Sequence, residues 1–138
     1  MRPTSLTAIL VLALLTGCRS DAPEAQVRKA FEACRKAVEA GDAAAATASL
    51  DPSFRGPEGM DKGSARLFLM GTFRQEKVGI TVVRNEVSIQ RNEALEDVDL
   101  MLTSRSGSLL PQEASHRAFR LRWRKAGSEW RLVELQLD

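Results

Sequence analysis

Two cysteines and one histidine carry the most reactive side chains of this 138-residue sequence. They are Cys18, Cys34 and His116, and their intervals match no zinc-ligand pattern, in which ligands come in closely spaced pairs. We therefore expect no metal site and no cofactor. The net charge of +2 gives no indication of nucleic-acid binding. Each of the three residues has to be interpreted from its own neighbours.

Cys18 ends an N-terminal segment that has the layout of a secretory signal peptide. Arg2 and the amino terminus give a positive start, and residues 6–15 (LTAILVLALL) form an apolar stretch. The stretch is too short to span a bilayer, which needs about 20 apolar residues, but it is typical of a signal peptide. The tetrapeptide that closes it resembles the bacterial lipobox and consists of Leu15, Thr16, Gly17 and Cys18.

This resemblance implies cleavage before Cys18 and a diacylglycerol on its thiol. Two or more acyl chains anchor a protein stably, since each buried methylene adds about 0.8 kcal/mol. The alternative is a plain cleaved signal with a cysteine nearby. We expect residues 1–17 to be the signal, 18–21 a lipidated tether and 22–138 one domain. In enterobacterial lipoproteins, an aspartate directly after the lipidated cysteine retains the protein in the inner membrane. This chain has Arg19 at that position, and the resemblance therefore implies an outer-membrane protein that faces the periplasm.

Cys34 lies within an apolar helical stripe, where cysteine commonly behaves as a small buried hydrophobic residue. Lipidation of Cys18 would leave it without a disulfide partner in an oxidising compartment. A disulfide between the two would require that lipidation fails. A reactive Cys34 thiol is the other alternative.

His116 is the one imidazole that could act as a general base near neutral pH. By alternation it shares a strand face with three arginines and not with Phe119 and Trp123, which argues against a place in a pocket. The carboxylates from which a base could come are Asp97, Asp99, Glu86 and Glu134. The two aspartates point opposite to Val98 and Leu100, away from the expected core. We therefore assign no catalytic residue.

The segment HRAFRLRWRK, residues 116–125, is the strongest polar feature. Arg120, Arg122 and Arg124 form a ladder along one face of a strand, about 6.6 Å apart. The aromatic residues lie on the opposite face, so the stacking platform of a single-strand nucleic-acid site is missing. Three interpretations remain: cross-strand pairing with Asp97 and Asp99, contact with an anionic envelope ligand, or a dimer interface.

The first half of the domain has helical periodicity. The spacing of its apolar residues predicts a helix over 21–40 with Asp21 as N-cap, ended by Gly41. Asp42 caps a short helix through Leu50, and a loop with a short strand near 53–55 follows. A third helix begins after Asp61 and runs to about Gln75. Its apolar run 67–70 covers more than half of the circumference, so we expect it to be wedged between other elements.

The second half alternates with period two and predicts four strands. They cover about 80–89, 98–102, 116–125 and 130–137, with turns at 92–93 and 126–128. The stretch 104–108 with Pro111 reads as a loop. In the last strand Trp130 and Leu132 occupy one face and Val133, Leu135 and Leu137 the other. A strand that is apolar on both faces is covered on both, either by a partner or by the lining of a pocket.

Helices followed by long antiparallel strands make an α+β domain, and the order of these elements resembles the nuclear transport factor 2-like superfamily. The matching pieces are Phe31 and Val38 with EAGDAAAATASL after them, FRGPEGMDKGSARLFL before and within the third helix, and Trp130-Arg131-Leu132-Val133. The resemblance covers essentially residues 22–138. It implies three N-terminal helices packed in a strongly curved sheet that forms a cone with a pocket.

Relatives in that superfamily isomerise steroids, dehydrate, cyclise polyketides, hold an apolar ligand or only dimerise, so the fold does not fix the activity. Its steroid isomerases use an aspartate base and a tyrosine, and this chain has no tyrosine. We expect a membrane-anchored, non-catalytic binding or interaction domain that holds a small apolar ligand or forms a homodimer through its sheet. The alternative is an isomerase or dehydratase using a pocket carboxylate or His116. The residues expected to line the pocket are Phe31, Leu67, Met70, Phe73, Phe119, Leu121, Trp123 and Trp130.

Overall fold

The computed structural model describes residues 21–104 and 116–138. Its elements are α1 (Pro23–Glu39), α2 (Ala43–Thr47), β1 (Leu50–Arg55), the short 3-10 helix η1 (Pro57–Gly59), α3 (Lys62–Gln75), β2 (Val78–Gln90), β3 (Glu93–Ser104), β4 (His116–Ala126) and β5 (Glu129–Leu137). The α+β class is confirmed. No helix in these two ranges combines the length and apolarity that crossing a bilayer needs.

Several sequence-based predictions fall outside the described residues. They are the signal peptide over 1–17, the lipobox residues Leu15, Thr16 and Gly17, the lipidated Cys18, and the loop around Pro111. These remain predictions.

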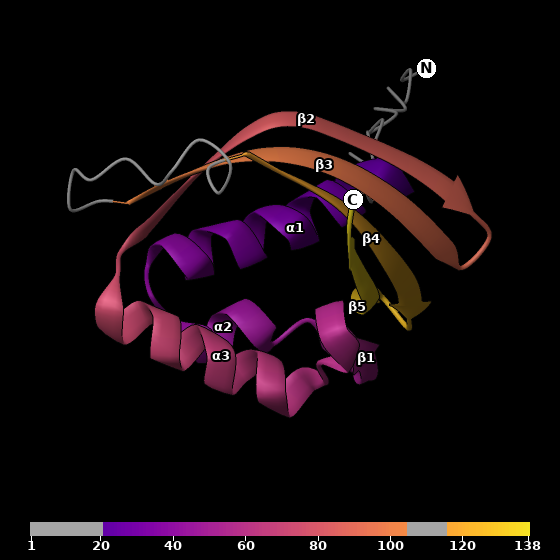
Figure 1. Ribbon diagram of the computed structural model, residues 1–138. Helices are drawn as coiled ribbons and strands as arrows, with labels where there is room; N and C mark the ends of the chain where they lie inside the picture. The colour runs from indigo at the N-terminus through magenta and orange to yellow at the C-terminus, as the bar shows by residue number, and fades with distance from the viewer. Residues whose placement is uncertain (1–20, 105–115) are drawn as a thin grey trace, which may run out of the picture.

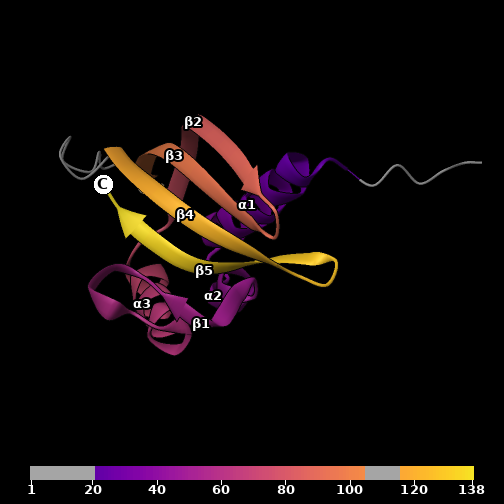
Figure 2. The same ribbon diagram turned by 90° about the vertical axis from the view of Figure 1, so that its right-hand side faces the viewer.

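The five strands form one sheet in the order β1-β5-β4-β3-β2. Strands β2 to β5 pair antiparallel as a meander, and β1 adds to β5 in parallel. The sheet curves over α1, while α2 and α3 lie beyond α1 next to β1 (Figures 1 and 2). Strand β1 is longer than the short strand we expected, and it contains Pro52, which an edge strand tolerates because one side of its backbone makes no ladder bonds.

The helix ends are set mainly by local hydrogen bonds. Oδ1 of Asp42 accepts a hydrogen bond of 3.0 Å from the Ala45 amide and caps α2, and Asp61 forms a capping box with Ser64 at the start of α3. The cap at Asp42 was predicted, and for α3 the start after Asp61 was predicted but not the capping box. The predicted cap of α1 was wrong: Ala22 is the N-cap without a side-chain bond, since the Asp21 carboxylate pairs with Lys29 instead.

Two β-bulges explain why apolar residues stand next to each other in strands. The pairing of β4 with β5 shifts between Arg122 and Trp123, which leaves Val133 as the extra residue. Leu135 and Leu137 then return to the face of Trp130, because Leu135 lies opposite Leu121. Our prediction that Leu135 and Leu137 face away from Trp130 was therefore wrong. Val133, the extra residue, is buried but does not belong to the core cluster. A similar shift in β2 lies at Val83, which is 61% exposed.

The core lies between α1 and the concave face of the sheet and also includes residues of β1 and α3. Its buried members are Val27, Phe31, Leu50, Phe54, Ala65, Ala94, Val98, Leu100, Leu121, Trp123, Trp130 and Leu132. All of them fall between residues 27 and 132, so the part of the chain from residue 19 onward contains this entire core.

Helix α3 is less enclosed than the sequence suggested. It contacts α2 and β1, and only Ala65 is fully buried among its residues. Leu67 is 69% exposed and Phe68 is 60% exposed. The prediction that α3 is wedged between other elements was wrong, because the sheet curves over α1 and leaves the outer side of α3 uncovered (Figure 1).

Candidate functional site

One carboxyl group lies on the apolar concave face of the sheet. Strand β3 turns Ala94, Glu96, Val98 and Leu100 inward, and all four are buried. Glu96 has 0% exposure and is the one fully buried titratable side chain among the described residues. A carboxyl group in such a place needs hydrogen-bond partners, because burial removes its contacts with water.

Trp123 and Asn85 are the polar neighbours of this carboxyl group. The indole Nε1 of Trp123, on β4, donates a hydrogen bond of 3.0 Å to Oε1 of Glu96. Asn85, on β2, interacts with the same carboxyl group and, like Trp123, favours its ionised form. Oε2 of Glu96 and Oδ1 of Asn85 are buried without a hydrogen-bond partner. Both atoms are acceptors, so a proton on Oε2 of Glu96 would give that oxygen a hydrogen atom to donate.

Burial raises the pKa of Glu96 to about 7, against the lowering effect of Asn85, Trp123 and the charge of Arg28. About half of the molecules therefore hold a neutral carboxylic acid at neutral pH. Such a group has the acidity of a general acid or base. Its complete enclosure, however, leaves no exposed atom that a substrate could touch in this conformation.

Cys34 lies on α1 near this carboxyl group. Its Sγ is 3.0 Å from Oγ of Ser49, and burial is the main cause that raises the pKa of the thiol. A raised pKa keeps the thiol protonated and poorly nucleophilic. Cys34 is a free cysteine, and its surroundings favour the structural interpretation over a reactive thiol.

The residues predicted to line a cone pocket separate into three groups. Phe31, Leu121, Trp123 and Trp130 fill the core, and Phe119 packs against it. Leu67 is exposed on α3. Met70 and Phe73 line a different hollow, outside the concave face of the sheet.

That hollow, here called the α2–α3 cleft, has a volume of about 510 Å³. It is lined by Gly41, Asp42, Ala43, Ala44, Arg66, Met70, Phe73 and Arg74. Gly41 adopts a φ of +70° at the end of α1, which favours glycine. An added Cβ there would lie 3.9 Å from Cβ of Phe73. The floor of the cleft is therefore apolar, and the cleft is within the size range of small-molecule sites.

A second hollow of about 400 Å³ lies where η1 meets the end of β5. Its lining is Arg55, Gly56, Pro57, Glu134, Leu135, Gln136 and Leu137. It combines one cation with one carboxylate and has fewer apolar side chains in its floor than the α2–α3 cleft.

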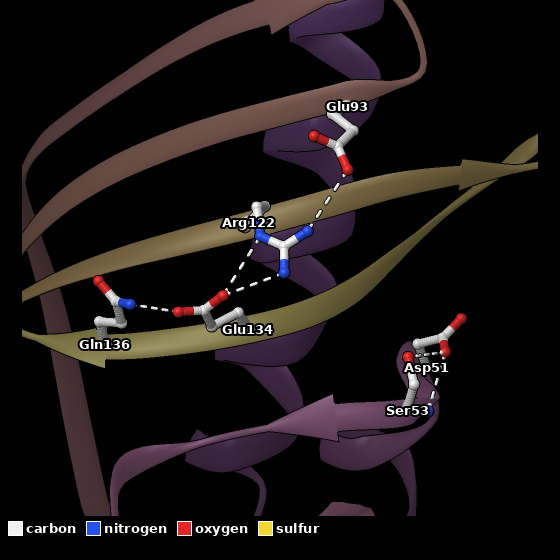
Figure 3. Close-up of polar contacts among 6 residues, drawn as sticks. All are labelled: Asp51, Ser53, Glu93, Arg122, Glu134 and Gln136. Atoms are coloured by element: carbon white, nitrogen blue, oxygen red, sulfur yellow. Dashed lines mark hydrogen bonds and ion pairs between the residues drawn. The ribbon is translucent and has the colours of Figure 1, made fainter.

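Arg120, Arg122 and Arg124 of β4 lie on the convex face, and the first two are paired with acidic residues. Arg122 reaches Glu134 at 3.0 Å and Glu93 at 3.4 Å, and Gln136 donates to Glu134 (Figure 3). Arg120 pairs with Asp97 at 2.9 Å. These contacts favour the paired-surface interpretation for both arginines, although Asp99 pairs with Arg84 on β2 rather than with the ladder.

Arg124 forms no ion pair with any acidic side chain in the described part of the chain and lies near Asp51. The side-chain and backbone hydrogen bonds from Ser53 hold the pKa of Asp51 below its ordinary value (Figure 3), and the charges of Arg124 and Arg131 add to this effect. Arg124 is exposed, so of the three arginines it is the one that could most easily meet an external anion.

His116 is exposed at the first residue of β4 and lies opposite Met101 in the register. Met101 points to the convex side, because its neighbours Leu100 and Leu102 belong to or pack against the core. His116 and Glu96 are thus on opposite faces of the sheet and cannot act together on one substrate.

Sequence reasoning missed Glu96 and Asn85. The signal for Glu96 was present: positions 94, 96, 98, 100 and 102 share one phase of the alternation, and four of the five are apolar. The signal for Asn85 was weaker: Asn85 shares the phase of Val87 and Ile89, but the bulge at Val83 interrupts that phase after Val82.

The comparisons with known proteins bear on the fold. No family model matches the sequence, and no curated protein matches it. A protein with a cystatin-like fold from Nostoc punctiforme aligns with a TM-score of 0.68 and 14% identity over 83% of this chain and 88% of that one. A nuclear transport factor 2-like protein from Novosphingobium aromaticivorans aligns with a TM-score of 0.68 and 15% identity over 82% and 79%.

Bd1075 of Bdellovibrio bacteriovorus aligns with a TM-score of 0.69 and 12% identity over 81% of this chain. The alignment spans 40% of that longer chain. At these identities the likeness shows the fold alone. The helices followed by a curled sheet are the nuclear transport factor 2-like fold, which confirms the fold expected from the resemblance.

Proposed function

We propose that this chain is a lipid-anchored protein of the bacterial cell envelope whose domain binds a small apolar ligand without catalysing a reaction. The observation that carries the non-catalytic part is the enclosure of Glu96 at 0% exposure. The accessible α2–α3 cleft offers one carboxylate, Asp42, and this group is engaged in capping α2. The cleft therefore presents apolar side chains to a ligand, flanked by Arg66 and Arg74, and its one carboxylate is already hydrogen-bonded.

The anchor is supported by the sequence. An apolar stretch, a lipobox-like tetrapeptide and Cys18 stand in that order, and α1 begins at Pro23, shortly after the cysteine. The domain would face the periplasm at a short distance from the bilayer. Arg19 in the position after the cysteine supports the outer membrane.

Metabolic labelling with radioactive palmitate tests the anchor. We expect the label on the wild-type chain and none on Cys18→Ala. We further expect the Arg19→Asp variant to shift from outer-membrane to inner-membrane fractions in an enterobacterial host. An unlabelled wild-type chain that still carries residues 1–17 would contradict the anchor.

Native mass spectrometry tests ligand binding. Residues 19–138, which contain the whole described core, are purified and sprayed from a volatile buffer. We expect a bound lipid-like mass that is lost in Met70→Asp, within the cleft, and retained in Val83→Asp, on the convex side. A bound mass that persists in Met70→Asp contradicts the cleft as the site. A bare monomer contradicts a binding module, and a stable dimer without ligand favours an interaction through the sheet.

A second candidate is an isomerase or dehydratase that uses Glu96, and the pKa of about 7 favours it. This candidate requires an open conformation in which the carboxyl group meets a substrate. Labelling of the folded protein with a water-soluble carbodiimide at pH 6.5 distinguishes the two functions. Modification of Glu96 together with Glu93 favours the enzyme, whereas modification of Glu93 alone favours the binding module.

A further inference from the structure

Two unpaired guanidinium groups flank the apolar floor of the α2–α3 cleft. Arg66 and Arg74 both line it, and neither forms an ion pair with an acidic side chain in the described ranges. They are separated by two turns of α3, about 12 Å along the helix axis. Met70 and Phe73 lie between them on the same stripe, at the i+4 and i+7 positions from Arg66. Along this stripe of α3, the side chains that line the cleft are therefore first cationic (Arg66), then apolar (Met70 and Phe73), and then cationic again (Arg74).

Positive charges outnumber negative ones around this stripe. Helix α3 carries Lys62, Arg66 and Arg74 and no aspartate or glutamate. The nearest lining acid, Asp42, accepts the Ala45 amide hydrogen bond and is thereby directed to α2. By contrast, Arg120 and Arg122 of the convex face are both paired with carboxylates. An external anion would meet two guanidinium groups without ion-pair partners among the described residues and one capping carboxylate in the cleft, but compensated charge at Arg120 and Arg122.

We propose that the α2–α3 cleft selects an amphipathic anion, an acyl chain that ends in a carboxylate, and this inference rests on the proposed function. The chain would lie over Met70 and Phe73, and the carboxylate would accept hydrogen bonds from Arg66 or Arg74. Both views place the start of α1 on the side of the molecule away from α3 (Figures 1 and 2). A protein tethered just before α1 would therefore present α3 away from its own membrane, to a ligand in the periplasm.

The experiment compares three probes with the same chain: decanoate, decanol and decylammonium. Their binding to residues 19–138 is followed by the amide chemical shifts of α2 and α3 and by calorimetry. We expect decanoate to bind about tenfold more tightly than decanol, as a charge-assisted hydrogen bond at an exposed site provides, and decylammonium to bind least. Raising the salt concentration should reduce the advantage of decanoate.

The double variant Arg66→Gln/Arg74→Gln should lose the tenfold preference and still bind decanol. Arg91→Gln, in the turn between β2 and β3, is the matched control and should keep the preference. Equal binding of decanoate and decanol to the wild type would overturn the anionic class and leave an apolar binding module standing. No shift of α2 and α3 amides with any of the three probes would overturn the inference and the proposed cleft together.

Discussion

Glu96 and Asp99 lie three residues apart on β3, on opposite faces of the sheet, and their carboxyl groups behave in opposite ways. Burial raises the pKa of Glu96 to about 7. The hydrogen bond from Arg84 holds the pKa of Asp99 below its ordinary value. The concave side offers Glu96 only neutral side chains as polar neighbours, the Trp123 indole and Asn85, while the convex side offers Asp99 a guanidinium at 2.9 Å.

The difference shows that the face of the sheet, and not the residue type, determines what a carboxyl group can do here. On the concave face a proton is the least costly way to neutralise the charge, because no cationic side chain of the described residues is buried there. On the convex face cations are already present, so the carboxylate stays ionised and its interactions are weak and screened by salt. Substitutions on the two faces should therefore differ both in size and in pH dependence.

The largest effect is expected for Trp123→Ala. Trp123 is fully buried, and its indole donates a hydrogen bond of 3.0 Å to Glu96. The cavity left by the indole should lower the free energy of unfolding by about 3–5 kcal/mol. Urea unfolding followed by far-ultraviolet circular dichroism measures this. A decrease in the free energy of unfolding of less than about 1 kcal/mol would mean that side chains on the concave face are packed less closely than in the structure.

The next largest effect is expected for Glu96→Gln, whose stability relative to the wild type should depend on pH. The carboxyl group has a pKa of about 7 in the folded chain and an ordinary value of 4.5 in the unfolded chain. Between these values the folded state alone keeps the proton, so the stability of the wild type falls by about 1.4 kcal/mol per pH unit from this group. Glutamine keeps an acceptor for Trp123 and has no proton to lose. The stability advantage of the variant should grow by about 3 kcal/mol from pH 4.5 to pH 8.

Urea unfolding at several pH values, with the variant and the wild type side by side, measures that advantage. Glu93→Gln, at the exposed start of β3, is the matched control and should show no such growth. An advantage of Glu96→Gln that is constant across the pH range would contradict a neutral acid in the core.

Much of the fold followed from local patterns. The cap at Asp42, the start of α3 after Asp61, the end of α1 at Gly41 and the alternation of β3 and β4 depend on neighbours within a few residues. The sequence shows those neighbours directly. The order of the elements and the resemblance to a known superfamily then predicted the cone-shaped fold. The predicted pocket failed to appear as one group, because Met70 and Phe73 face α2 while Trp123 and Trp130 fill the core.

The two bulges and the buried acid could not be derived in the same way. A bulge is decided by the partner strand, so the adjacent Leu132 and Val133 suggested a strand covered on both faces. Asn85 came to the concave face only through such a shift in β2. Asp21 does not cap α1, because its carboxylate pairs with Lys29, eight residues along the chain. The sequence alone does not show which of two possible partners a carboxylate binds.

The smallest effect is expected on the convex face. Arg122→Met keeps most of the aliphatic stem and removes the contacts with Glu134 and Glu93 (Figure 3). All three side chains are partly exposed, so the loss should stay below about 1 kcal/mol and decrease further when salt is raised from 0.05 to 0.5 M. Arg120→Met, which removes the single pair with Asp97, should cost less still. Urea unfolding at the two salt concentrations measures both variants. A salt-independent loss above 2 kcal/mol for Arg122→Met would show that this network is buried in solution, as it would be if a second copy of the chain covered the convex face.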